Sequence, residues 1–174
     1  METASATRIE VPAQDLKIEP LEADAFAPYG TVMPAFEDGK EFGPDEAQLE
    51  LSRGTPRFYV MRLHRRAPAF NQITRHLAVT QCLAAVGGGS WFIAVAPPDD
   101  PDNPAATPDL ARLRAFRVPG DVAVMLHRST WHAGPFFSPE TMDFFNLELA
   151  DTNQVDHHSC RLDLTFGRTY RFVD

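Results

Sequence analysis

The segment Gly120–His132, which reads GDVAVMLHRSTWH, decides how the rest of the chain is interpreted. A Pro-Gly turn opens it, and residues 121–126 form an apolar run that is typical of a β-strand. Its second half places two histidines, an arginine and a tryptophan within six residues. Reactive side chains directly after a turn and a strand indicate a site at the end of a sheet.

Further strand signals lie on both sides of this segment. Apolar, aromatic and β-branched runs predict strands at residues 56–64, 90–96, 113–118 and 142–149, and strict alternation predicts another in LDLTF, 162–166. Short helical turns are expected in 22–30 and 107–113. The stretch VGGGS, 86–90, precedes a strand and not a helix, so it predicts a hairpin turn and not a phosphate loop. Many short strands separated by turns predict an all-β sandwich or barrel.

Length and composition limit the classes of function. The 174 residues suit a flexible arm over 1–14 and one domain over 15–174. The net charge of −8 and the lack of a basic cluster argue against nucleic acid as a partner. The chain contains neither a long apolar run nor a secretory signal, so we expect a cytoplasmic protein without a membrane partner. Cys82 and Cys160 lack metal or redox spacing and are expected as free thiols.

Two spacings resemble the motifs of the cupin jelly roll, a metal-binding barrel. In residues 74–88, His76 is followed after four residues by Gln81, with Thr74 and Gln81 at positions where cupins have histidine and glutamate. Gly120-Asp121 followed by His132 resembles the second motif with one residue more. The resemblance implies a cupin double-stranded β-helix with short helical turns.

Strand alternation predicts which side chains meet. Alternate residues of a strand face a barrel interior, so His76, Gln81 and His132 are expected to converge at its mouth. Asn146 and Glu148 share one face of the strand in 142–149. A carboxylate in such an apolar run needs a partner or a task, so Glu148 is a site candidate.

Residues 127–131 offer further candidates. His127 would face away from the site on an unbroken strand, unless the residues after it turn the chain. Arg128 is the nearest group that can grip a carboxylate with two hydrogen bonds. Trp131 is expected as a core residue or pocket wall, and the histidines at 157 and 158 as surface residues.

The chain resembles the ureidoglycolate lyases, formerly called ureidoglycolate hydrolases, from about residue 16 to the 150s. HRSTWHAGPFF, 127–137, is similar to their His-Arg-x-x-Trp-His signature, and Arg75, His76 and Gln81 match their first motif. Residues 41–63 and 146–157 are more similar to a plant and algal branch. Thr74 and Glu148-Leu149 stand where bacterial members usually have an acidic residue and Asp-Arg.

The resemblance implies a homodimeric lyase that splits ureidoglycolate into glyoxylate and urea, late in allantoin and purine breakdown. The reaction needs a base and an acid, for which the candidates are His132 or Glu148 and His76 or His127. The expected binding groups for a small carboxylate-bearing substrate are Arg128, Arg75, Gln81, Trp131 and Asn146.

A divalent metal on His76, Gln81 and His132 is a further expectation. The resemblance suggests nickel, while the ligand types also suit manganese, iron or zinc, and a metal-free site is the alternative. Two other functions stay open: a cupin enzyme of another class, such as an isomerase or dioxygenase on a different hydroxy acid, and a non-catalytic binder of small acids.

Overall fold

The computed structural model describes residues 11–174. Most of the arm expected over 1–14 therefore lies outside the described residues. Its last two residues belong to strand β1 (Ala13–Pro20), in which Ala13 pairs with Thr169 and Gln14 with Tyr170.

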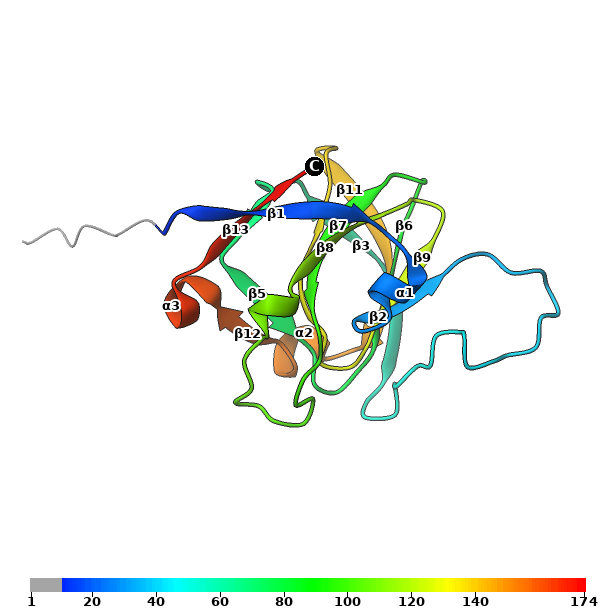
Figure 1. Cartoon of the computed structure of the whole chain (residues 1–174). Helices are drawn as coiled ribbons and strands as arrows, with labels where there is room; N and C mark the ends of the chain where they lie inside the picture. Colours follow the sequence, from blue (N-terminus) through cyan, green and yellow to red (C-terminus); the bar gives the residue numbers. More distant parts are fainter. Residues whose placement is uncertain (1–10) are drawn as a thin grey trace, which may run out of the picture.

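The described chain folds into two sheets (Figure 1). The eight-stranded sheet has the order β12 (His158–Arg161), β5 (Gln72–Arg75), β10 (Trp131–Phe136), β7 (Trp91–Ala96), β8 (Arg114–Val118), β1, β13 (Thr169–Val173) and β4 (Ala69–Phe70). The five-stranded sheet has the order β2 (Gly30–Met33), β9 (Ala123–Leu126), β6 (Gln81–Ala85), β11 (Thr141–Leu149) and β3 (Pro56–His64). The helices are short: α1 (Ala23–Phe26), the 3-10 turn η1 (Leu110–Arg112), α2 (Thr152–Val155) and α3 (Leu162–Phe166).

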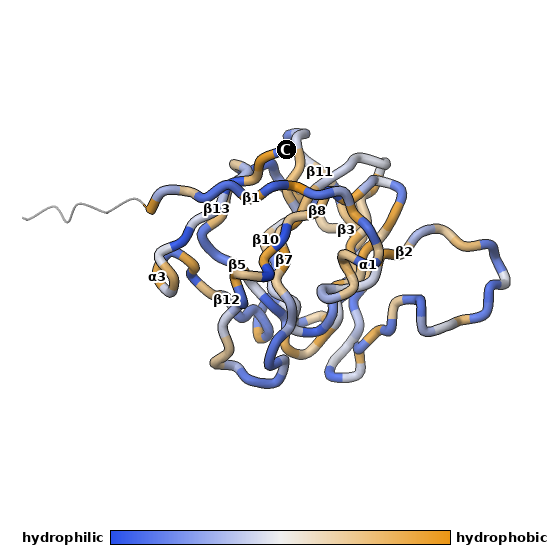
Figure 2. Tube along the Cα trace, viewed as in Figure 1, coloured by the Kyte–Doolittle hydropathy of each residue, from blue (hydrophilic) through white to orange (hydrophobic). Residues whose placement is uncertain are grey.

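The two sheets curl around a shared apolar core, which confirms the predicted all-β cupin fold. Leu83 of β6 and Phe144 of β11 face Trp91 and Ile93 of β7, and all four are at most 2% exposed. Burial of one such side chain stabilises the fold by about 1.5–3 kcal/mol. In Figure 2 many hydrophobic stretches lie along the strands, whereas the long connection between β2 and β3 mixes hydrophilic and hydrophobic stretches.

Strand β1, near the start of the described chain, pairs with one strand from the middle of the chain and one from its C-terminal end. It lies between β8 and β13 and runs parallel to both, with Ile18 opposite Ala115 and Leu16 opposite Phe172 (Figure 1). Because β8 and β13 do not pair with each other, β1 holds the two parts of the eight-stranded sheet together.

The glycine stretch at 86–90 is not a hairpin turn. It connects β6 of one sheet to β7 of the other, so the prediction of a hairpin was wrong. Gly87 and Gly88 have positive φ angles of 88° and 79°, which side chains rarely adopt. A Cβ on Gly120 would lie 2.0 Å from the Gly88 carbonyl oxygen, so the connections between sheets pack backbone against backbone.

LDLTF was also predicted wrongly, because it forms helix α3 and not a strand. Leu162 is fully buried, but Leu164 is 75% exposed, so the alternating residues do not share a buried face. Asp163 accepts hydrogen bonds from the Leu164 N–H and the Arg161 guanidinium, and Gly167 ends the helix with a φ of 61°. Five residues are too few for periodicity to separate a strand from a helical turn.

No helix within residues 11–174 has the length and apolar character to cross a membrane.

Candidate active site

Two imidazoles lie side by side where β5 and β10 meet. His132 pairs with Thr74 across the two strands, and His76 follows the end of β5. The two rings are 5.2 Å apart between centroids. The backbone N–H of Ser129 donates to the His76 carbonyl at 2.8 Å, which fixes the turn before β10 against the end of β5. The structure thus brings together the two histidines that the motif spacings indicated.

Both imidazoles present a proton acceptor. The Nδ1 of His76 lies 2.6 Å from the Asp156 carbonyl, and the Nδ1 of His132 lies 3.1 Å from the Thr130 carbonyl. A carbonyl only accepts, so each Nδ1 carries the proton and each Nε2 has a free lone pair. Burial lowers the pKa of His132 to about 3 and also lowers the pKa of His76, although the charges of Asp156 and Glu148 oppose the latter. Both rings are therefore neutral at pH 7.

A third imidazole stands beside this pair. His157 is exposed, as expected, but its ring lies 5.8 Å from that of His76. The preceding Asp156 carboxylate accepts the N–H groups of Leu77 and Ala78 at 2.7 and 2.8 Å, which holds this loop at the site. No periodic pattern pointed to His157, because a loop and not a strand positions it.

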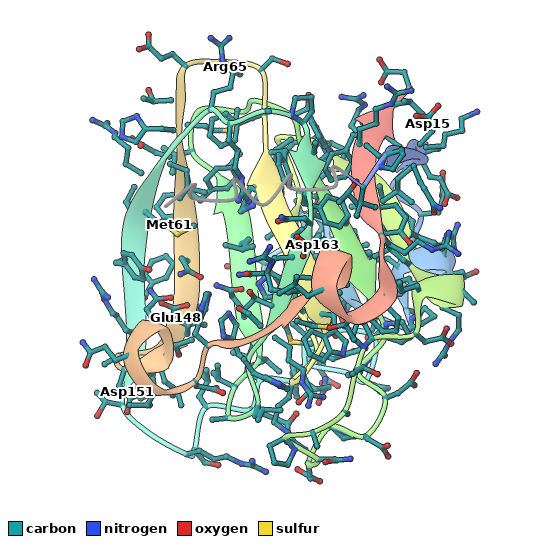
Figure 3. All side chains as sticks on the ribbon, turned by 90° about the vertical axis from the view of Figure 1, so that its left-hand side faces the viewer. Asp15, Met61, Arg65, Glu148, Asp151 and Asp163 are labelled. Atoms are coloured by element: carbon teal, nitrogen blue, oxygen red, sulfur yellow. The ribbon has the colours of Figure 1, made fainter. Side chains whose placement is uncertain are left out.

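A polar network covers the inner face of the five-stranded sheet near the end of β11 (Figure 3). The Gln81 amide donates to Glu148 and to Asn146, both at 3.1 Å, and Tyr59 Oη donates to Glu148 at 3.1 Å. Glu148 is 1% exposed, so these donors compensate for the burial of its carboxylate. Gln81 Oε1 is buried and has no hydrogen-bond partner among residues 11–174.

Tyr59 is a site residue that the sequence analysis missed. It lies on β3 directly opposite Asn146, whose amide donates to its hydroxyl at 3.1 Å. Burial raises the pKa of Tyr59, so the phenol keeps its proton and remains a donor to Glu148. Strand alternation in the predicted strand 56–64 could have pointed to Tyr59 as an inward-facing residue. Its pairing with Asn146 depends on the strand register, which cannot be read from the sequence.

A cleft of ≈ 400 Å³ opens onto His132 and His157. Backbone and side chains from β4, β5, β10 and the loops after β3 and α2 line it: Arg66, Ala69, Phe70, Asn71, Gln72, Thr74, His132, Ala133, Gly134 and His157. Its volume accommodates a small polar molecule.

Three predicted site residues lie elsewhere. His127 faces α1, with Nε2 3.0 Å from the Ala27 carbonyl, although Ser129 does turn the chain with a φ of 70°. Its role as an acid is therefore a prediction that this placement does not support. Arg128 donates from Nη1 to the Leu77 carbonyl at 2.9 Å and to Asp102 at 2.8 Å.

Arg75 is likewise committed to the loop between β7 and η1. It is fully buried and donates to His158 Nδ1 at 3.0 Å and to the Asn103 carbonyl at 2.5 Å. Its guanidinium also lies over the Trp131 ring at 4.5 Å. Trp131 belongs to the core on the other face of the sheet, which is one of the two roles that were expected for it. Arg75 and Arg128 therefore anchor a loop, and neither of these two predicted binding residues lines the cleft described above.

The residues present do not form a ready metal cage. Within the described part of the chain, no group of three or more His, Cys, Asp or Glu side chains is arranged to hold an ion. His76 and His132 each offer a free Nε2 and Gln81 offers its unpartnered Oε1, but these two imidazoles and one neutral amide include no anionic group to balance the charge of a divalent ion. Nickel or another divalent metal stays a prediction, and we derive no chemical step from it.

Comparison with known proteins gives a consistent result. A family model described as ureidoglycolate lyase matches residues 13–166. The chain is 28% identical over 115 residues to a ureidoglycolate lyase of Escherichia coli strain SMS-3-5, and 27% identical over 115 residues to one of Shigella boydii. Each match covers 66% of this chain and 64% of the relative, so the similarity spans just under two thirds of the relatives' length.

Proposed function

This chain belongs to the ureidoglycolate lyase family, and we propose that it cleaves ureidoglycolate into glyoxylate and urea. The observation that carries the proposal is His132, a neutral imidazole with a free Nε2 that lines a cleft large enough for the substrate. The family match and the names of the relatives support the same reaction.

The reaction moves one proton from the hydroxyl oxygen to the ureido nitrogen, and both of these atoms are bonded to the same carbon. Ureidoglycolate carries a hydroxyl, a carboxylate and a ureido nitrogen on that carbon. His132 takes the hydroxyl proton through Nε2, the oxygen electrons form the new C=O bond, and the C–N bond breaks with its electrons on nitrogen. The protonated imidazole then returns the proton to the departing urea nitrogen, as the histidine of a serine protease serves as base and then acid. No water is consumed, so the reaction is an elimination.

The remaining polar groups bind and orient. His76 packs beside His132, and its buried ring restricts the partner ring to one orientation. Gln81 does not line the cleft, and we propose that its buried, unpartnered Oε1 accepts an N–H of the ureido group when the substrate reaches past His132. Glu148 and Asn146 accept from the Gln81 amide and hold it in this orientation, and Tyr59 supports them by donating to Glu148.

The test is product release by the purified protein. Wild type should release glyoxylate and urea in equal amounts without ammonia, and His132→Gln should lower kcat by about 10²–10⁴-fold, the usual contribution of a positioned base. His127→Gln is the control, because this histidine lies against α1 and should leave the rate unchanged. Absence of turnover by wild type, or an unaffected His132→Gln variant, would contradict the proposal.

We also propose a homodimer that pairs through the outer face of the five-stranded sheet. Phe58, Val60 and Phe145 are 67%, 53% and 40% exposed there, and the two phenylalanine rings stack at 5.7 Å. Such an apolar patch favours association. A cytoplasmic location and a place in allantoin and purine breakdown complete the proposal, in accord with two free cysteines.

A further inference from the structure

A small carboxylate in the cleft needs a cation, and this requirement rests on the proposed function. An unpaired carboxylate is costly to remove from water, whereas a guanidinium can bind both of its oxygens. Arg75 and Arg128 already bind carbonyl groups and Asp102. The carboxylate therefore requires another cation close to His132.

Among residues 11–174, Arg66 is the one lysine or arginine that lines the cleft. It follows β3 in the loop that leads to β4, next to Arg65, which Figure 3 shows at the far end of the β3–β11 pair from Glu148. Its guanidinium lies over the ring of buried Phe136, 4.2 Å from the centroid. The guanidinium packs on that ring while Arg66 as a whole is exposed, so its N–H groups stay available for a ligand.

Two observations place the Arg66 charge in the cleft and leave it free. Arg66 and His132 line the same cleft, so the guanidinium and the imidazole belong to one site. No carboxylate in residues 11–174 lies within ion-pair distance of Arg66, unlike the guanidinium groups of Arg62, Arg114 and Arg128.

We propose that Arg66 binds the carboxylate of the substrate and thereby places the reacting carbon against His132. One end of the substrate is then held at the loop after β3, and the carbon that bears the hydroxyl lies between the guanidinium and the imidazole. The site selects small acids that carry a hydroxyl next to the carboxylate. Arg57, which stacks on Tyr59 at 3.7 Å, is the competing cation, but it does not line this cleft.

The experiment measures binding of two matched probes by calorimetry. Glycolate carries the carboxylate and hydroxyl of the substrate, and glycolamide is its neutral counterpart. Arg66→Ala should weaken glycolate binding by about ten- to hundredfold, the usual value of hydrogen bonds to a charged group, and leave glycolamide unchanged. Arg66→Lys should recover part of the loss, because an ammonium group cannot make the two-pronged contact.

Arg65→Ala is the control, because it removes the same charge from the neighbouring residue, which donates to the Ser138 carbonyl outside this cleft. Unchanged glycolate affinity in Arg66→Ala, or an equal loss in Arg65→Ala or Arg57→Ala, would overturn the proposal. Turnover of ureidoglycolate is measured separately. Arg66-dependent glycolate binding without turnover would reject the lyase function and keep the site, whereas turnover with an unchanged KM in Arg66→Ala would keep the function and reject the site.

Discussion

His132 should make the protein less stable as the pH falls from 7 to 5. Its pKa is about 3 in the folded state, against 6.5 for an unperturbed histidine. Between these two values the unfolded chain binds a proton that the folded chain does not bind. The contribution of neutral His132 to the free energy of unfolding is therefore fully present above pH 6.5 and is lost progressively as the pH falls toward 3.

The size of the effect follows from the two pKa values. Each pH unit between them is worth about 1.4 kcal/mol, so lowering the pH from 7 to 5 should cost about 2 kcal/mol at this residue alone. Urea unfolding of wild type and His132→Gln at pH 7 and pH 5 isolates this amount. The lowered pKa values of carboxyl groups and of His76 also make the unfolding free energy depend on pH. These effects occur in both proteins, so they cancel when the loss in His132→Gln is subtracted from the loss in wild type.

The result that refutes this reasoning is an equal loss of stability in wild type and His132→Gln. It would mean that the folded protein accepts a proton on His132 near pH 6.5, so that the ring is solvated and does not serve as a neutral base. The kinetic counterpart is the acid side of the pH profile: kcat/KM should stay level between pH 7 and pH 5 while the protein remains folded, because the base is already unprotonated.

Three further predictions concern other parts of the molecule. Glu148→Gln turns an amide N–H₂ toward the hydrogen-bond donors of Tyr59 or Gln81, so unfolding in urea should show a loss of about 1–3 kcal/mol, and an unchanged midpoint would contradict the network. Arg128→Ala should lower the unfolding free energy by about 2 kcal/mol and leave glycolate affinity unchanged in calorimetry, because this arginine holds a loop. Phe145→Asp should shift the mass measured by light scattering from dimer to monomer, and a persistent dimer would place the interface on another face.

The fold was predictable where strands were long and aromatic. The expected strand at 56–64 has the same bounds as β3, because nine residues with alternate side chains give a clear pattern. The errors concern short segments. LDLTF forms a helical turn fixed by Asp163 and Gly167, and the glycine stretch at 86–90 crosses between sheets, which depends on tertiary pairing that five residues cannot encode.

The site was predictable where motif spacing applied and unpredictable where loops or register decide. His76 and His132 were found from their distances to turn residues, and the structure places their rings together. Tyr59 belongs to the site because strand register places it opposite Asn146. Arg66 and His157 belong to it because they lie on loops that line the cleft. A linear sequence gives the chemistry of such residues but not the surface that they face.

The position of β1 also determines when the barrel can form during synthesis. Asp15 on β1 forms an ion pair with Arg171 on β13, 156 residues further along the chain. While the ribosome is still making the middle of the protein, β1 has only β8 as a partner, and the edge that β13 will occupy stays open. Closure of such a distant contact is slow, and an open strand edge invites pairing with another nascent chain. Asp15, Lys17 and Glu19 place charges along β1, and charged side chains on an open edge disfavour such pairing until β13 has been synthesised.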